Sequence, residues 1–113
     1  MAAVGGMVHI PWYANLFRGD KFRLALLEIA PVALRYGAKE WQVYRAHDDQ
    51  YKFLQLATFE RKMDFERYWT GEEFSIWRGD YTSWYQVPVL YNWNDLVIRG
   101  GIGLGAQNGE RVA

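Results

Sequence analysis

The stretch Glu40–Phe59, EWQVYRAHDDQYKFLQLATF, decides the fold. Aromatic and β-branched residues alternate with polar ones in Glu40–Arg45, and Lys52–Phe59 is rich in residues that favour strands. The segment between them, His47–Gln50, has the polar composition of a turn. The stretch therefore predicts a β-hairpin. In its first strand, Trp41 and Val43 would lie on one face and Gln42 and Tyr44 on the other.

Upstream, the sequence predicts a strand and then a helix. Val8–Ala14 has the alternation of a strand, and Pro11, which has no N–H to donate, predicts a bulge or an unpaired position. A helix over residues 20–36 is expected to begin with Asp20 as its N-cap and to end at Gly37 in the left-handed region. Pro31 inside this helix predicts a kink near Leu27, because it removes a backbone hydrogen bond.

Downstream, a second helix and a last strand are expected. Arg61–Trp69 reads as a helix that a capping box at Thr70–Glu73 restarts, so the helical region covers residues 62–80. Tyr85–Val97 reads as the last strand, where Pro88 marks a bulge or an edge position.

The resulting order, βαββαβ, predicts an α+β fold of the ferredoxin-like kind. Right-handed crossovers place two helices on one face of a four-stranded antiparallel sheet with strand order 4-1-3-2. The other face stays bare, and we expect it to carry Trp and Val side chains. Because monomers rarely expose such a patch, we predict a homodimer, that is, a dimeric α+β barrel.

Composition limits the function classes. The 113 residues include six Trp, eight Tyr and six Phe, more ring area than one small core needs, which favours an interface or a ligand cavity. Thirteen basic and thirteen acidic residues predict no nucleic-acid partner. The lack of cysteine excludes disulfides, thiolate zinc sites and iron–sulfur clusters. We expect no metal, cofactor or membrane span, and a cytoplasmic location.

Glycine positions suggest three segments. Five of the eleven glycines lie in the last fourteen residues. We therefore expect an N-terminal tail at 1–7, one domain at 8–98 and a Gly-rich C-terminal tail at 99–113.

A resemblance to a known superfamily rests on residues 59–81 and the strand that follows. The specific pattern is Phe65–Trp69, then Gly71–Phe74 with Trp77-Arg78, then Val87–Tyr91. It resembles the dimeric α+β barrel superfamily over residues 8–98. Members include antibiotic-biosynthesis-type monooxygenases, haem-degrading enzymes and small isomerases, so the resemblance implies a fold and a dimer more than a reaction.

The branches of this superfamily imply different site residues. The haem-degrading branch uses an Asn near the first strand, a helix Trp and a helix His; Asn15 and Trp69 or Trp77 match two of these roles. No His follows His47 in this sequence, so haem degradation of that type is disfavoured. The quinol-oxidising branch implies cofactor-free oxygenation in a pocket lined by Asn, Trp, Tyr, His and Arg.

The candidate site residues follow from these patterns. His9 is a possible general base, because imidazole titrates near neutral pH, but a strand-face hydrogen-bonding role is also open. His47 beside Asp48 and Asp49 is better explained as a solvated turn than as a metal site. The remaining candidates are Asn15 and Tyr44 as catalytic polar groups and Trp69, Trp77, Tyr81, Tyr85 and Arg78 as ligand-binding groups between the helices and the sheet.

Two function classes remain open from the residues. The first is an enzyme or binding protein for a small planar, apolar or aromatic molecule, without metal. The second is a non-catalytic dimeric interaction module whose Gly-rich tail docks on a partner. A cavity between helices and sheet would favour the first class, and a filled core would disfavour it.

Overall fold

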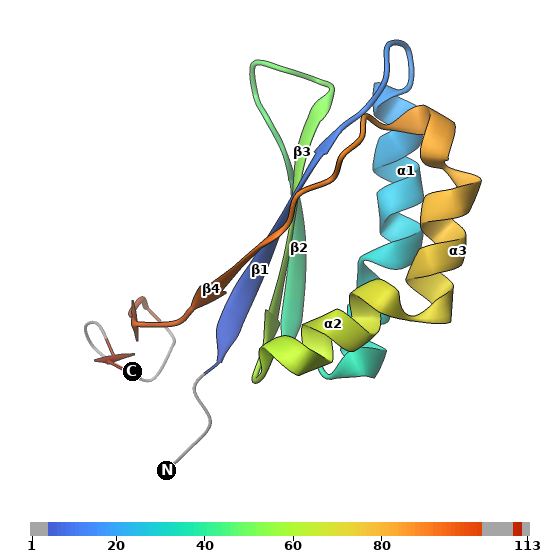
Figure 1. Cartoon of the computed structure of the whole chain (residues 1–113). Helices are drawn as coiled ribbons and strands as arrows, with labels where there is room; N and C mark the ends of the chain where they lie inside the picture. The colour runs from blue at the N-terminus through green and yellow to red at the C-terminus, as the bar shows by residue number, and fades with distance from the viewer. Residues whose placement is uncertain (1–4, 103–109, 112–113) are drawn as a thin grey trace.

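The structure, a computed structural model, describes residues 5–102 and 110–111. In these residues the helices cover one side of the sheet (Figure 1). The elements in chain order are β1 (Gly6–Tyr13), α1 (Gly19–Ile29), the 3-10 helix η1 (Pro31–Tyr36), β2 (Glu40–Arg45), β3 (Lys52–Phe59), α2 (Lys62–Thr70), α3 (Glu72–Asp80), the 3-10 helix η2 (Thr82–Trp84), β4 (Asn92–Asp95), β5 (Ile98–Arg99) and β6 (Glu110–Arg111).

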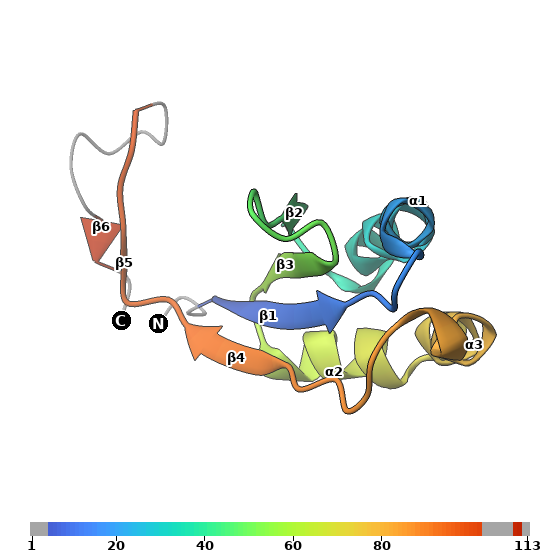
Figure 2. The same ribbon diagram turned by 90° about the horizontal axis from the view of Figure 1, so that it is seen from above.

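The main sheet has the order β2-β3-β1-β4 and is antiparallel throughout (Figure 2). This confirms the predicted ferredoxin-like order 4-1-3-2. The hairpin pairs Glu40 with Thr58 and Arg45 with Phe53, and β1 runs along β3 from Gly6↔Phe59 to Tyr13↔Lys52. The central pair of strands is thus the one that the hairpin sequence and its upstream strand predict.

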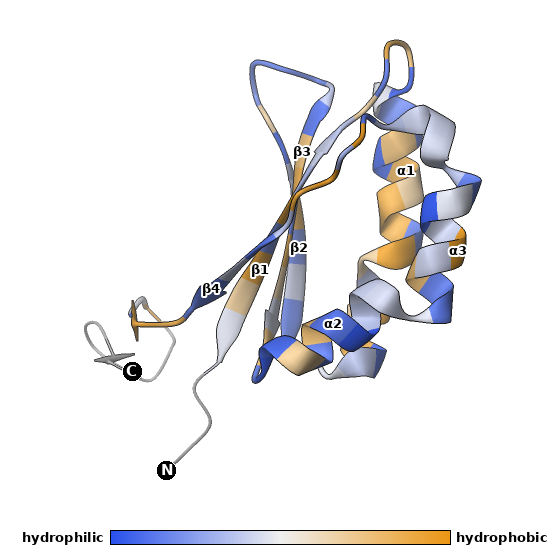
Figure 3. Cartoon of the chain, in the orientation of Figure 1, coloured by the Kyte–Doolittle hydropathy of each residue, from blue (hydrophilic) through white to orange (hydrophobic). Residues whose placement is uncertain are grey.

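Burial alternates along β1 and assigns its two faces. Val8, Ile10 and Trp12 are fully buried and face the helices, whereas Met7 and His9 lie on the other side. Hydrophobic residues are concentrated along α1 and the inner strands (Figure 3). The core therefore fills the layer between the helices and the sheet.

The sequence predicted Trp and Val side chains on the sheet face away from the helices. For Trp41 and Val43 this prediction was wrong. Trp41 pairs with Ala57 and Val43 with Gln55, and both of these partners are buried. Since direct cross-strand partners share a face, Trp41 and Val43 face the helices and pack on the core.

The first helical region is divided at Ala30 and is not a single kinked helix. Pro31 is the first residue of η1, where its missing N–H costs no helical bond. Gly37 ends η1 with φ 102, as predicted. The predicted N-cap was wrong: Arg18 occupies that position without a side-chain cap, and Asp20 lies in the first turn.

The second helical region breaks at Gly71, between α2 and α3, as predicted. The backbone of Gly71 is extended at this break, and only glycine fits there: a Cβ would lie 2.7 Å from the Arg67 carbonyl oxygen and 2.8 Å from the Tyr36 hydroxyl. The expected capping box does not form, because Gly71 itself is the N-cap of α3 and no side chain caps it.

The last strand is shorter than predicted. β4 covers only Asn92–Asp95, and Tyr85 forms an isolated bridge with Ala14. Pro88 lies in the irregular segment before β4 and follows a cis peptide bond. The pairing of β1 with β3 is regular through Pro11, so the predicted bulge is absent. On the other side, β4 pairs only with residues 6–9. Pro11 is therefore unpaired on that side, which was the alternative prediction.

Regular structure occurs on both sides of residues 8–98. β1 begins at Gly6, inside the segment expected as a tail, and Ile98–Arg99 pairs with Glu110–Arg111 in a small second sheet. In both views the segment after β4 runs on the side away from the helices (Figures 1 and 2). Within residues 5–102 and 110–111, no helix has the length and apolar character to cross a membrane.

Candidate functional site

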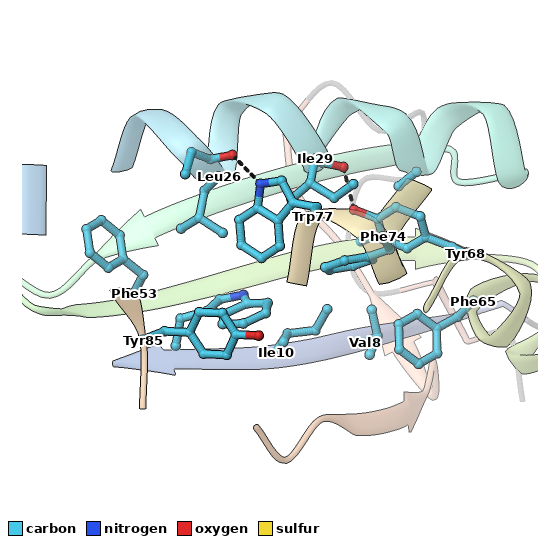
Figure 4. Close-up of a cluster of buried hydrophobic side chains, with 14 of the residues drawn as sticks. Val8, Ile10, Leu26, Ile29, Phe53, Phe65, Tyr68, Phe74, Trp77 and Tyr85 are labelled. Atoms are coloured by element: carbon cyan, nitrogen blue, oxygen red, sulfur yellow. Dashed lines mark hydrogen bonds between the residues drawn. The ribbon is translucent and has the colours of Figure 1, made fainter. Parts of the chain in front are cut away.

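The predicted ligand-binding rings are linked to one aromatic cluster between the helices and the sheet, in which Figure 4 shows Trp77 and Tyr85. Trp69 and Tyr81 are only partly buried and pack against this cluster. Trp12 lies at its centre: its ring centroid is 5.3 Å from that of Trp77, 5.1 Å from Tyr85 and 5.6 Å from Phe22. Trp69 packs against Phe74 at 4.9 Å. Edge and tilted ring pairs of this kind add about 1 kcal/mol each beyond the burial of area.

A buried hydrogen-bond chain crosses this cluster. The Trp12 Nε1–H donates to Gln55 Oε1 (3.0 Å), and Gln55 Nε2 donates to the Tyr68 hydroxyl (3.0 Å). Tyr68 donates in turn to the Ile29 carbonyl at 2.5 Å (Figure 4). Burial raises the pKa of Tyr68 well above its ordinary value. Because Gln55 is fully buried, these bonds explain why a polar residue is tolerated there.

The other predicted ring residues also bond to the protein itself. Trp77, 5% exposed, donates its Nε1–H to the Ala25 carbonyl at 2.9 Å. Tyr81 donates to Glu28 at 2.7 Å, and this hydrogen bond raises the pKa of Tyr81. Tyr85 donates to the Arg78 carbonyl at 3.0 Å, and burial raises its pKa.

Arg78 is held by stacking. Its guanidinium lies 4.0 Å from the Trp69 ring centroid and 5.0 Å from that of Phe74, and Nη1 donates to the Trp69 carbonyl at 2.7 Å. Partial burial lowers the pKa of Arg78. Arg78 thus joins the end of α2 to α3.

Trp77 and Tyr81 also meet at the outer surface, in a groove between α1 and α3. Its volume is about 310 Å³. The groove is lined by Glu28, Ile29, Val32, Glu73, Ile76, Trp77, Asp80 and Tyr81. Two of the predicted ligand-binding rings are therefore brought together beside carboxylates.

The three predicted catalytic residues do not converge with these rings. His9 and Tyr44 lie on the sheet face away from the helices, one on β1 and the other on β2. Asn15 follows β1, and its Nδ2 donates to the Ser83 carbonyl at 2.7 Å and to the Tyr85 carbonyl at 3.4 Å. The sheet separates His9 and Tyr44 from the aromatic cluster.

The face opposite the helices, hereafter the open face, was not predicted residue by residue. Register and burial assign to it Met7, His9, Pro11, Tyr13, Glu40, Gln42, Tyr44, Leu54, Leu56, Thr58, Asn92 and Asn94. One end is hollowed into a pocket of about 560 Å³, lined there by His9 and Thr58 and, on the other side, by Leu96–Arg99. The alternation of residues in β1, β2 and β3 is the sequence signal from which the residues of this face could have been predicted.

Two polar atoms on the open face are buried without a hydrogen-bond partner within the protein: Gln42 Oε1 and Thr58 Oγ1. Thr58 pairs with Glu40 across β2 and with Met7 across β1, so it lies in the middle of the sheet. Such groups are normally satisfied by water or by a partner molecule. In the described part of the chain, no three His, Cys, Asp or Glu side chains are grouped to hold a metal ion.

Comparisons with known proteins identify the fold. The sequence matches no family model, and it matches no curated protein. SnoaB from Streptomyces nogalater, described as a cofactor-independent oxygenase, superposes with a TM-score of 0.68 at 12% identity, over 89% of this chain and 99% of that one.

Two further solved structures are similar. A candidate antibiotic biosynthesis monooxygenase from Nitrosomonas europaea gives a TM-score of 0.72 at 13% identity, covering 94% of this chain and 98% of that one. A protein of unknown function from Bacteroides thetaiotaomicron, described as a possible oxidoreductase, gives 0.71 at 11% identity, covering 84% and 100%. The predicted resemblance is thus confirmed for the fold. Sequence identities this low do not show that the reaction is shared.

Proposed function

We propose that this chain acts as a homodimeric interaction module whose open face packs on the same face of a second copy. The observation that supports the proposal is the open face itself. Leu54, Leu56, Met7 and Pro11 lie on its two middle strands, and each is only partly buried within the chain. Tyr44 at its margin is 58% exposed.

The size of the face bears on how the two copies meet. The four strands, of eight, six, eight and four residues, make a face of roughly 400 Å² in projection. A stable interface buries about 800 Å² per partner. The segment after β4 offers the remaining surface: Val97 and Ile98 are more than half exposed and lie away from the helices. The predicted docking of the Gly-rich tail concerns residues that are mostly outside the described ones.

The aromatic layer supports this proposal over cofactor-free oxidation. The polar atoms of Trp77, Tyr81 and Tyr85 are already hydrogen-bonded within the protein. The one strand histidine, His9, is on the other side of the sheet, so it does not lie beside these rings. An oxygenase site of the predicted kind would need both groups in one cavity.

A matched pair of leucine variants tests the proposal. Leu56→Arg places a charge in the centre of the open face, whereas Leu24→Arg changes a 55%-exposed leucine on α1. Light scattering at micromolar concentration should give a dimer for the wild type and Leu24→Arg and a monomer for Leu56→Arg, with similar circular dichroism for all three. A monomeric wild type, or a dimeric Leu56→Arg, would contradict the proposal.

A second candidate function is the binding of a small planar molecule in the groove between α1 and α3. The observation in its favour is that Trp77 and Tyr81 meet there, 5.3 Å apart between ring centroids. Titration of quinols and flat aromatic compounds should change tryptophan fluorescence saturably in the wild type and weakly in Trp77→Leu, with Tyr36→Phe as the control. No saturable change in the wild type with any compound would exclude this candidate.

A further inference from the structure

The loop between β1 and α1 contains a turn of unusual sequence. The Arg18 N–H donates to the Asn15 carbonyl at 2.9 Å, which closes a four-residue turn with Leu16 and Phe17 in its centre. Phe17 has φ 66, and among non-glycine residues it alone has positive φ in the described part of the chain. A positive φ at the third position defines a type II turn, where Gly is the usual residue and a bulky one is strained.

Several contacts fix this turn in place. The Ala14 N–H donates to the Tyr51 carbonyl and the Asn15 N–H to the Trp84 carbonyl, both at 2.8 Å. Gly19 lies directly against the β2–β3 hairpin, where a Cβ would be 2.9 Å from Arg45 Nη2 and 3.0 Å from the Gln50 carbonyl oxygen. The turn is therefore a rigid feature that the fold enforces.

The strain is not compensated by burial of the two side chains. Phe17 is 84% exposed and Leu16 67% exposed, in the loop between β1 and α1 (Figure 1). A glycine at position 17 would relieve the strain and lose almost no packing. Strain that persists in an exposed residue points to a use outside the folded monomer.

A hollow lies beside the turn, and Phe17 forms part of its lining. It has a volume of about 370 Å³ and is lined by Phe17, Gly19, Asp20, Lys21, Gln50 and Tyr51. The same patch thus carries an apolar projection, a recess, the exposed Asp20 carboxylate, which pairs with Arg45 at 2.9 Å, and the exposed Lys21 amine. A two-fold interface requires a patch that is complementary to itself, and this one combines a projection with a recess and carries both signs of charge.

We infer that this turn forms a second interface, in which Phe17 of each copy inserts into the hollow beside the turn of another copy. The interface is at a different place from the open face and does not depend on it. Where both operate, dimers associate into larger assemblies as concentration rises.

The test compares wild type with Phe17→Gly by sedimentation velocity from low micromolar to submillimolar concentration. Wild type should show a concentration-dependent step beyond its smallest species, and Phe17→Gly should lack it while unfolding at a higher temperature. Leu34→Asn, which replaces a 50%-exposed leucine on η1, should keep the step. In the Leu56→Arg background, the wild-type turn should still associate at submillimolar concentration, above the micromolar range in which the proposed function requires that variant to be a monomer, which separates this inference from the proposed function.

Two results would overturn the inference. One is a wild type with no such step across the whole range. The other is a Phe17→Gly protein that associates as wild type does, whether or not its unfolding temperature rises.

Discussion

Replacing Tyr68 with Phe removes one hydroxyl and leaves two buried groups without partners. Gln55 Nε2 loses its acceptor and the Ile29 carbonyl loses its donor, both in the fully buried layer. An orphaned buried polar group costs about 1–3 kcal/mol, so we expect Tyr68→Phe to lower the free energy of unfolding by about 2–4 kcal/mol.

Tyr36→Phe is the matched control. The Tyr36 ring lies 5.8 Å from that of Tyr68, but its hydroxyl is 3.5 Å from Glu73 and only partly buried. This change should stay within about 0.5 kcal/mol of wild type.

Urea unfolding at one fixed protein concentration measures both variants, because association makes the apparent stability depend on concentration. The m-value should stay unchanged, so the loss appears in the midpoint. A Tyr68→Phe protein within about 0.5 kcal/mol of wild type would refute the reasoning, since the hydrogen-bond chain would then not stabilise the layer.

Two further predictions concern pH and glycine. Burial raises the pKa of Tyr68, so the folded state favours the protonated phenol; its stabilising contribution is complete below the unfolded pKa of about 10 and is lost as pH rises beyond it. Thermal unfolding followed into alkaline pH should therefore decline less steeply in Tyr68→Phe than in wild type; equal slopes would contradict this. Gly71→Ala should destabilise by about 1–3 kcal/mol because its Cβ meets the Arg67 carbonyl, whereas Gly79→Ala, whose Cβ meets nothing within 4 Å, should stabilise by about 0.5–1 kcal/mol. Equal effects of the two changes in thermal unfolding would show that the contact at Gly71 relaxes freely.

The strand order could be predicted from sequence because a hairpin joined to two right-handed crossovers leaves few topologies. The composition of the open face could not be predicted. Alternation separates Trp41 and Val43 from Gln42 and Tyr44 but does not say which pair faces the helices. The polarity of a residue did not indicate its face, because the polar Gln55 points toward the helices and forms hydrogen bonds with Trp12 and Tyr68.

The last strand was predicted to be longer than it is, because packing between aromatic rings, and not strand pairing, holds the residues before β4 in place. Tyr85 packs on Trp12 at 5.1 Å and Tyr91 on Phe65 at 4.8 Å between ring centroids, so strand-favouring residues are held without a full ladder. The candidate site had a similar ambiguity. Helical spacing of Trp69 and Trp77 is the same for core and for a pocket wall. The two are distinguished by the Trp77 Nε1–H bond to the Ala25 carbonyl and by the packing of Trp69 between Phe74 and Arg78.

Sedimentation equilibrium of the unmodified chain at low micromolar concentration tests the central claim most directly. Association through the open face predicts a mass of twice the 13.3 kDa of the chain. A single species of 13.3 kDa across the micromolar range would show that the open face remains exposed to water, and would contradict the account.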